Sequence, residues 1–359
     1  MAEPKTFVSV HDLMALAVQQ KASDLHITAG LPPVFRLDGR LVQLEVERLS
    51  AMDCQTLIYE ILADRNIAEF EAKHQLDLSY GASGIGRFRV NIYMQRGSIA
   101  AAFRPIPSDI PSIEELNLPL VIGDLAKRTS GLILVTGPTG CGKSTTLASV
   151  IDVINKTHEC HILTIEDPIE YLHRHQKAMV NQRELGSDTF TFAEALRGAL
   201  REDPDVVLVG EMRDLETIQS ALTIAETGHL VLGTLHTRNA PQSVDRIIDV
   251  FPPYQQSQIR VLLANTVEAI IAQQLLPRYG AKGRVPAVEV LLVNSAVRNL
   301  IREAKTHQIY SVMDTTGEQG MQTMDKALAL LVRRRMVSHE EATLRALDPD
   351  SYSRWLQNL

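Results

Sequence analysis

One short segment carries a glycine-rich pattern that could bind phosphate groups: Gly137-Pro138-Thr139-Gly140-Cys141-Gly142-Lys143-Ser144-Thr145. Its glycines let consecutive backbone N–H groups converge on phosphate oxygens at a helix N-terminus, where the helix dipole also favours anions. In such a loop Lys143 reaches the terminal phosphates and the Ser144 hydroxyl binds magnesium. An apolar run at 132–135 precedes the segment and a helix-forming run at 145–154 follows it. Because the pattern occurs with its required strand and helix, we predict that it binds ATP with Mg²⁺ and is not merely a glycine-rich turn. We expect Cys141 to be a small filler.

Two acidic groups follow apolar, strand-like runs: Glu211 after 206–209, and Glu166, Asp167 and Glu170 after 161–165. A carboxylate at the end of such a strand can reach the metal side of a phosphate loop and activate the attacking water. The second group lies at the carboxyl edge where α/β sheets bind ligands, and it suits magnesium bound through water. Solvated carboxylates and a surface turn are the structural alternatives. We predict catalytic roles for Glu211, Glu166 and Glu170, and magnesium ligation by Ser144, Asp167 and Glu211.

Two histidines bracket a third apolar run, at 230–232: His229 precedes it and His236 follows shortly after it. A neutral histidine at such a place could sense a γ-phosphate or bind a catalytic carboxylate, so we predict a catalytic role for both. A structural role at a strand end is the alternative.

Four arginines, Arg87, Arg89, Arg96 and Arg104, are concentrated in one N-terminal stretch. Phe88, Val90 and Ile92 alternate with polar residues there, which predicts a half-buried strand with Arg87 and Arg89 on its outer face. A solvated face is the default interpretation. However, an arginine that reaches the transferred phosphoryl group raises turnover by roughly 10³ to 10⁵. We therefore predict that at least one of Arg87, Arg89 and Arg104 contacts nucleotide held by a neighbouring subunit.

The composition is that of a soluble globular protein: 359 residues, 45% hydrophobic and 22% charged. No run approaches the length of a membrane span, and no basic segment followed by an apolar run opens the chain, so we expect a cytoplasmic protein. The net charge of -7 disfavours nucleic acid as a partner. The three cysteines are widely spaced, which indicates neither a disulfide framework nor a structural zinc site.

A cluster of prolines between Pro105 and Pro119 divides the chain, and we expect an N-terminal domain at 1–106, a linker at 107–122 and a second domain at 123–359. In the second domain, apolar runs alternate with helical stretches, which predicts an α/β fold with a mostly parallel sheet. Ile259, Leu263, Val267, Ile270 and Ile271 recur at spacings that predict one face of a long helix. Further helical stretches are expected towards the C-terminus.

Together these motifs resemble those of the secretion-type ATPases, and more narrowly the retraction ATPases of type IV pili. The resemblance extends from Ala22-Ser23-Asp24-Leu25-His26 to Gly320-Met321-Gln322-Thr323-Met324-Asp325. In family terms, 166–170 resembles the Asp box, Gly210-Glu211 the end of the Walker B strand and 223–236 the His box. The resemblance implies a PAS-like α+β N-terminal domain, a RecA-like ATPase domain with a helical C-terminal region, and a homo-hexameric ring. It also implies that N-domain arginines reach nucleotide bound by a C-terminal domain.

The most discriminating stretch is Ala296-Val297-Arg298-Asn299-Leu300-Ile301-Arg302-Glu303. It resembles the AIRNLIRE motif of the retraction ATPases, with Val297 in place of isoleucine. Both residues are β-branched and apolar, so the difference is slight. We predict that residues 297–303 couple the motor to a partner, with the apolar members buried and Arg298, Arg302 and Glu303 free for a surface. Extension and secretion ATPases typically carry a four-cysteine zinc module, which is missing here.

The resemblance thus implies a cytoplasmic ATPase at the inner face of the cytoplasmic membrane that drives pilus depolymerisation through an inner-membrane platform protein. Membrane contact would be peripheral, and a paralogous accessory retraction ATPase is a further candidate partner. Three alternatives remain open: an extension or secretion ATPase, a nucleotide-gated accessory subunit that does not hydrolyse ATP, and a nucleic-acid translocase. Glu211 and the acidic group at 166–170 disfavour the accessory subunit, because a protein that does not hydrolyse ATP needs no acid to activate water. The net negative charge disfavours the nucleic-acid translocase.

Overall fold

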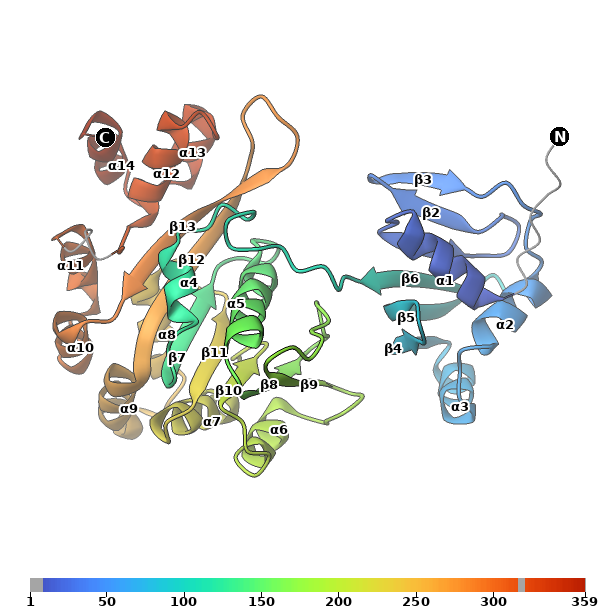
Figure 1. Cartoon of the computed structure of the whole chain (residues 1–359), viewed down its shortest axis with the longest axis horizontal. Coiled ribbons are helices and arrows are strands. Elements are labelled where there is room, and N and C mark those ends of the chain that lie inside the picture. The colour runs from blue at the N-terminus through green and yellow to red at the C-terminus, as the bar shows by residue number, and fades with distance from the viewer. Residues whose placement is uncertain (1–8, 316–319, 359) are drawn as a thin grey trace. The chain divides into compact units, whose positions relative to one another are not determined.

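The structure is a computed structural model that describes residues 9–315 and 320–358. The chain forms two compact units, Met1–Ser108 and Asp109–Leu359, each with its own hydrophobic core. Figure 1 labels the elements of both units.

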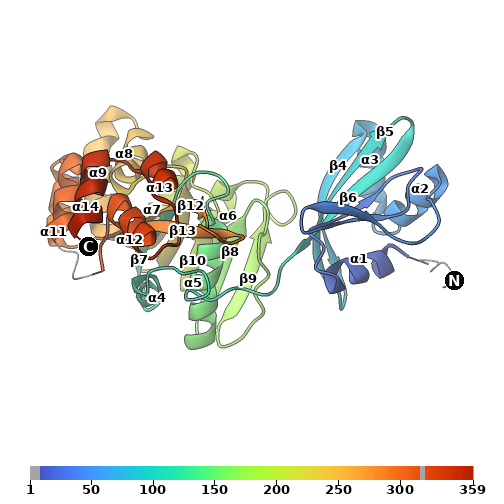
Figure 2. The same ribbon diagram turned by 90° about the horizontal axis from the view of Figure 1, so that it is seen from above.

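Over residues 9–108, the first unit is an antiparallel sheet with helices packed against it (Figure 2). Its strands, in the spatial order β3-β2-β1-β6-β5-β4, are β1 (Asp24–Ile27), β2 (Val34–Leu37), β3 (Arg40–Gln43), β4 (Gln75–Ala82), β5 (Gly86–Gln95) and β6 (Ser98–Ile106). The helices are α1 (Val10–Gln19), α2 (Ala51–Tyr59) and α3 (Asp64–Lys73). Phe88, Val90 and Ile92 of β5 are fully buried, as their alternation with polar residues predicts.

The second unit is built on a mixed sheet in the order β13-β12-β7-β11-β10-β8-β9. Its strands are β7 (Gly131–Thr136), β8 (His161–Glu166), β9 (Met179–Glu184), β10 (Val206–Val209), β11 (Leu230–Leu235), β12 (Val267–Pro277) and β13 (Arg284–Leu292). All neighbours are parallel except β12 and β13, which pair antiparallel. The parallel α/β architecture predicted from the alternating runs is therefore confirmed, with an antiparallel strand at one edge.

Helices cover both faces of this sheet. One face carries α4 (Val121–Leu125) and α5 (Lys143–Thr157). The other carries α6 (Phe192–Ala199), α7 (Leu215–Glu226), α8 (Ala240–Asp249), α9 (Pro253–Thr266), α10 (Ser295–Arg302) and α11 (Ile309–Thr315). A short 3₁₀ helix (Thr306–Gln308) lies between α10 and α11, and α12 (Met324–Arg333), α13 (His339–Arg345) and α14 (Pro349–Asn358) form a satellite core with β12 and β13. Because both faces are covered, every residue of a strand such as β7 is buried, and its residues 132–135 are all apolar.

Two expectations differ from the structure. The apolar series from Ile259 to Ile271 is not one helix, because α9 ends at Thr266 and β12 begins at Val267. Both faces of β12 are buried, so its apolar residues also satisfy helical spacing, and the β-branched Val267, Ile270 and Ile271 favour the strand.

The segment 107–122 is not a free linker along its whole length. Ile113, Leu118 and Ile122 are buried against α5, so everything after Ser108 belongs to the second unit. The prolines give the segment its irregular path, but they do not prevent the apolar residues between them from joining a core.

Candidate active site

The phosphate loop lies between β7 and α5. Gly137 has a φ of +140°, and a Cβ there would lie 2.4 Å from the carbonyl oxygen of Gln273. Gly142 immediately precedes α5 with a φ of 92°. Glycine is required at both positions, and the loop therefore ends at a helix N-terminus whose unpaired backbone N–H groups and dipole attract anions.

The lysine of the loop folds back over the loop itself. Lys143 Nζ donates hydrogen bonds to the carbonyl oxygens of Gly137, at 2.8 Å, and Pro138, at 3.3 Å. Both acceptors are neutral, and a phosphate anion is a stronger partner for an ammonium group. Cys141 is 3% exposed, and burial raises the pKa of its thiol. It therefore fills space within the loop, as expected.

A cleft of about 480 Å³ opens beside the loop and gathers residues from several strand ends. Most of the residues predicted to act in catalysis or to bind nucleotide or metal line it: Thr139, Gly140, Gly142, Lys143, Ser144, Thr145, Glu166, Asp167, Glu170, Glu211 and His236. They meet because β7, β11, β10 and β8 are parallel neighbours, so their carboxyl ends share one edge of the sheet. Gly137, Pro138 and Cys141 shape the loop and are not part of the cleft lining.

One side of the cleft holds Glu211, which follows β10. Its Oε1 contacts the Arg213 guanidinium and lies 2.9 Å from His236 Nε2, which follows β11. Partial burial by itself would raise the pKa of Glu211, but the contacts with Arg213 and His236 together lower it. The carboxylate is therefore negatively charged at neutral pH. Thr234 Oγ1 donates to the carbonyl oxygen of Gly210 at 2.5 Å and holds the two strand ends together.

The other side holds Glu166, the last residue of β8. Its carboxyl accepts hydrogen bonds from Thr164 Oγ1 at 2.7 Å and Gln182 Nε2 at 3.1 Å, and no cation contacts it among the described residues. Burial raises the pKa of Glu166 despite these donors. Asp167 and Glu170 line the cleft from the loop that follows. Two carboxyl groups at neighbouring strand ends thus have opposite electrostatic environments.

Some of the predicted catalytic residues lie elsewhere. The carbonyl oxygen of His229 accepts a hydrogen bond from the N–H of Gly131, the first residue of β7, at 3.0 Å. His229 is therefore at the amino end of β11, the edge of the sheet opposite the phosphate loop, and does not belong to this cleft. Only the carboxyl ends of parallel strands reach the ligand edge, so the two ends of one strand cannot share a site.

The three candidate arginines belong to the first unit, whereas the second unit lines the cleft. Arg89 and Arg104 are exposed and are direct partners across the β5–β6 pair. Arg104 is not merely solvated, because its Nε and Nη2 donate to Asp24 Oδ1 at 2.9 and 2.8 Å. Arg87 is on β5, as Arg89 is, and is partly buried.

Sequence reasoning missed several residues of the cleft, among them Tyr171, His173, Arg213 and Arg284. Tyr171 Oη lies 3.0 Å from Thr145 Oγ1. This contact joins the acidic loop, residues 167–178 between β8 and β9, to the first turn of α5. Burial lowers the pKa of His173 to about 4, so its ring is neutral. Arg213 could have been found from its place two residues after Glu211, but the contribution of Arg284 depends on the distant strand β13.

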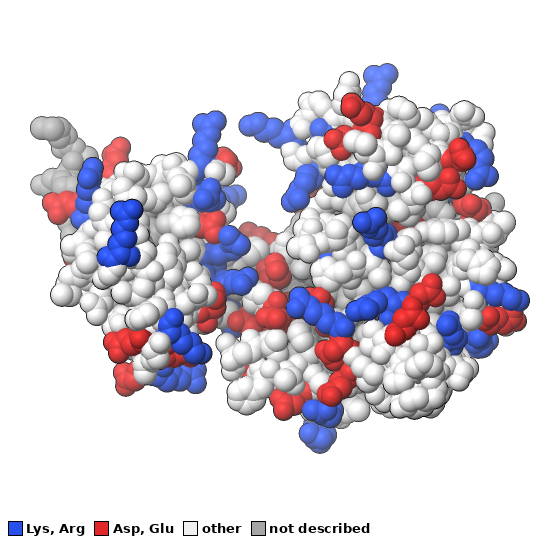
Figure 3. Space-filling view, turned by 180° about the vertical axis from the view of Figure 1, so that it is seen from behind, with Lys and Arg blue, Asp and Glu red and all other residues white. Residues whose placement is uncertain are grey.

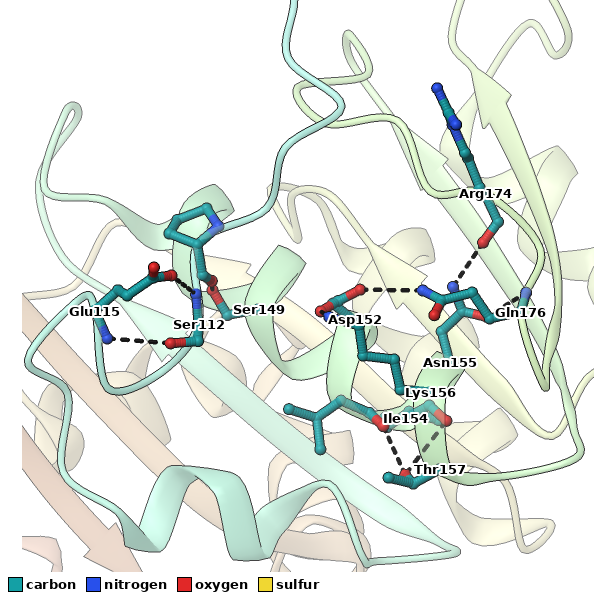
Figure 4. Close-up of polar contacts among 12 residues, drawn as sticks. Ser112, Glu115, Ser149, Asp152, Ile154, Asn155, Lys156, Thr157, Arg174 and Gln176 are labelled. Carbon is teal, nitrogen blue, oxygen red and sulfur yellow. Dashed lines mark hydrogen bonds and ion pairs between the residues drawn. The ribbon is translucent and has the colours of Figure 1, made fainter.

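Buried polar side chains of α5 hold two neighbouring segments in place (Figure 4). Asn155 Nδ2 donates to the carbonyl oxygen of Arg174 at 2.7 Å, and Asn155 Oδ1 accepts from the N–H of Gln176 at 3.1 Å. The Ser149 hydroxyl lies 2.7 Å from the carbonyl oxygen of Pro111, in the segment that leads from the first unit. The helix that carries the phosphate loop is therefore the common support of the acidic loop and of this segment.

The segment 296–303 forms α10, and two of its apolar residues are core residues: Val297 and Ile301 are fully buried. Arg298 is not free for a surface, contrary to expectation. Its guanidinium donates to the carbonyl oxygens of Ala264, at 2.6 Å, and Asn265, at 3.0 Å, and pairs with Glu268 at 2.5 Å. These carbonyls belong to the last turn of α9, where helix carbonyls lack partners and attract a cation.

Arg302 and Glu303 are exposed, as expected of a surface. Arg302 Nη2 reaches Asn265 Oδ1 at 3.0 Å, and Glu303 pairs with Lys305 at 2.7 Å.

On the face seen in Figure 3, Lys and Arg side chains are interspersed with Asp and Glu, with no large area of one sign. Among residues 9–315 and 320–358, no helix is both long and apolar enough to cross a bilayer.

Comparison with known proteins agrees with the geometry. Residues 112–344 match the family model described as type II/IV secretion system protein. The chain is 48% identical to the type IV pilus retraction ATPase PilT of Pseudomonas aeruginosa over 96% of its own length and 100% of that protein. It is 41% identical to the type IV pilus ATPase PilU of the same organism, covering 93% of this chain and 87% of that protein.

Among solved structures, the crystal structure of the pilus retraction motor PilT with bound ADP matches at a TM-score of 0.89 and 49% identity. The match covers 97% of this chain and 100% of the other. The family match spans more than half of the chain and the relative is covered completely. The chain therefore belongs to the type II/IV secretion system ATPases and, within them, to the group of the pilus retraction ATPase PilT.

Proposed function

We propose that this chain hydrolyses ATP in the cleft beside the phosphate loop and, as a homo-hexamer, drives the retraction of type IV pili and hence twitching motility. The observation that carries the proposal is the meeting of Lys143 and Glu211 in one cleft of a chain of this family. A phosphate-binding cation and a charged carboxylate at the same sheet edge are the two parts that phosphoryl transfer to water needs.

The nucleotide would bind along the loop 137–145, and the solved structure of the pilus retraction motor PilT contains bound ADP. Its phosphates replace the carbonyl oxygens that now hold Lys143, and the N-terminus of α5 stabilises their negative charge. Ser144, Asp167 and Glu211 offer hydroxyl and carboxylate oxygens, the donors that Mg²⁺ prefers. When bound, Mg²⁺ would neutralise charge on the phosphates. These donors fit the ion, since Mg²⁺ takes only one or two carboxylates and fills its remaining positions with water and phosphate.

Glu211 orients the attacking water in this proposal, because its pKa is lowered and it is ionised at working pH. His236 holds one carboxylate oxygen in place and so fixes the direction of the other. Glu166 and Glu170 are the next candidates for the base, should Glu211 serve only to bind the metal.

The direct test is ATP binding by Lys143→Ala. We expect the variant to lose measurable affinity, because the loop then lacks its cation. Lys156→Ala is a matched control, since Lys156 lies on the same helix but pairs with Asp152 at 2.5 Å, away from the cleft. Equal ATP affinity of wild type and Lys143→Ala would overturn the assignment of the site.

We further propose that at least one of Arg87, Arg89 and Arg104 acts on nucleotide held by a neighbouring subunit. Guanidinium groups bind phosphate in a planar, bidentate way that a single lysine does not provide. An arginine-to-alanine variant and Lys143→Ala, each inactive alone, should regain partial activity in mixed rings, because some interfaces then combine both intact parts. Mixed rings no more active than their components would contradict action in trans.

The exposed part of α10 is our candidate surface for the inner-membrane platform protein, at the inner face of the cytoplasmic membrane. Asn299→Ala with Arg302→Ala should reduce twitching while ATPase activity in solution is kept, because both side chains are exposed and distant in sequence from the loop. Substituting Ile301 would not test this, since Ile301 is a core residue. Normal twitching of the double variant would contradict the proposal.

Two alternatives remain for this family: a pilus extension or secretion ATPase, and an accessory subunit that works beside a hydrolysing paralogue. Deletion of the gene separates them. A retraction motor leaves cells with pili that do not retract, whereas an extension motor leaves cells without pili. An accessory subunit would show no ATP turnover when purified.

A further inference from the structure

Strand β12 carries a glutamine at the place where it passes the phosphate loop. β12 runs parallel to β7, and Ala272 is in register with Thr136, the last residue before the loop. Gln273 is the next residue, and it is only 2% exposed. A long amide buried among the apolar residues of a central strand is uncommon unless its polar atoms have a task.

The side chain of Gln273 contacts the helix that follows the loop. Its Nε2 donates a hydrogen bond to Thr146 Oγ1 at 2.9 Å, and Thr146 is also 2% exposed. Thr146 lies in the first turn of α5, two residues beyond Ser144. The amide oxygen of Gln273 has no hydrogen-bond partner among the described residues. Retaining a buried amide with one unpaired atom costs free energy that an apolar side chain would not.

The main chain of the same residue contacts the other end of the loop. The carbonyl oxygen of Gln273 lies 2.4 Å from the point where Gly137 would place a Cβ, so the strand and the start of the loop are in close contact. One residue therefore touches both the first residue of the loop and the helix into which the loop leads. The distance between these two ends determines how well the loop N–H groups surround a phosphate.

We propose that Gln273 is a positioning residue for nucleotide binding: it fixes the ends of the phosphate loop relative to each other through Gly137 and Thr146. The proposal rests on the function proposed above, since it requires that the loop binds ATP. Gln273 itself does not line the cleft, so it acts through the loop and not by contact with the nucleotide. Its effect falls on ground-state and transition-state binding alike, and therefore on KM more than on kcat.

The test is a set of variants assayed for steady-state kinetics with ATP and for equilibrium binding of ADP. Gln273→Met keeps the length of the side chain and removes the hydrogen bond. Loss of one buried hydrogen bond corresponds to about a three- to tenfold change in affinity. We expect KM for ATP and Kd for ADP to rise together by about that factor, with kcat within about twofold of wild type.

Gln274→Met is the matched control. Gln274 is the same residue type at the next position, and it points to the opposite face of the strand, where its Nε2 lies 3.5 Å from the carbonyl oxygen of Arg345. We expect no change in KM or Kd for this variant. Equal effects of the two substitutions would mean that Gln273 acts only through the stability of the strand.

A double-mutant cycle makes the assignment specific. Thr146→Val removes the acceptor without changing the shape of the side chain, and it serves if Gln273→Met does not fold. If the two residues act as one unit, the double variant binds ADP no more weakly than either single variant. Additive effects on Kd, or unchanged Kd in both single variants while the wild type binds ADP, would overturn the proposal. A wild type that does not bind nucleotide would instead overturn the proposed function.

Discussion

The two carboxyl groups at the ends of β8 and β10 lie on neighbouring strands, where Ile165 and Val209 are in register. They line the same cleft, yet burial raises the pKa of Glu166 while the pKa of Glu211 is lowered. The two groups differ in burial and in their partners. Glu166 is buried and accepts hydrogen bonds from the neutral donors Thr164, Gln182 and the N–H of Glu170, whereas Glu211 is partly buried and contacts Arg213 and His236. A cation outweighs the cost of burial, and neutral hydrogen bonds here do not.

The comparison assigns different tasks to the two groups. Glu211 carries a negative charge at neutral pH and can orient a water molecule or share a metal ion. The raised pKa makes Glu166 harder to ionise than Glu211, and its hydrogen bonds connect β8 to β9 and to the N–H of Glu170 in the loop that follows.

The largest effect is expected for Glu211→Gln. The variant keeps the shape of the side chain and loses the charge, so ATP should still bind while kcat falls by roughly 10² to 10⁴. Steady-state kinetics with a separate measurement of ATP affinity distinguish the two effects. If kcat is unchanged, the water is activated by another group and the comparison loses its functional meaning.

A third buried carboxyl, Glu289 on β13, tests whether burial without a cation raises a pKa elsewhere. It is fully buried and accepts hydrogen bonds from the N–H groups of Ala240, at 2.7 Å, and Met324, at 3.2 Å. Burial raises the pKa of Glu289 to about 7, with a further contribution from the charge of Asp325.

A carboxyl whose pKa is raised by folding stabilises the native state at low pH and loses this contribution as pH rises through the folded-state pKa. Between pH 4.5 and 7 the loss amounts to roughly 3 kcal/mol for Glu289. The advantage of wild type over Glu289→Gln in urea denaturation should therefore be greatest at pH 4.5 and below and shrink towards pH 7. A difference that is constant with pH would show that Glu289 does not titrate in this range.

A smaller effect is expected for Glu166→Gln. Glutamine keeps a side-chain oxygen that can accept the hydrogen bonds from Thr164 and Gln182, so kcat should fall by less than about tenfold and much less than for Glu211→Gln. Parallel measurement of the two variants at one pH is sufficient. The reverse order of effects would transfer the role of general base from Glu211 to Glu166.

The sequence predicts this cleft well because its main parts are local. The glycines of the loop, the strand before it and Glu211 at a strand end are each recognisable within a few residues. The place of Arg284 in the cleft and the contact of Arg298 with α9 were not predictable, because they depend on which segments fold against each other. The boundary of α9 and β12 was missed for a related reason: a strand buried on both faces has no alternation to reveal it.

The smallest effect at neutral pH is expected for Arg213→Ala, which removes one of the two groups that lower the pKa of Glu211. The active enzyme needs ionised Glu211, so activity falls as pH drops through the pKa of this group. Without Arg213 that pKa is higher, and the acid limb of the kcat/KM profile should move to higher pH, with little change on the alkaline side. Arg197→Ala is the control, because Arg197 pairs with the exposed Glu216 at 3.6 Å outside the cleft.

An acid limb that stays in place in Arg213→Ala would mean that His236 alone sets the charge of Glu211, or that the group titrating in the profile is Glu166. Repeating the profile with Glu166→Gln decides between these outcomes, because only in the second does the acid limb move when Glu166 is replaced.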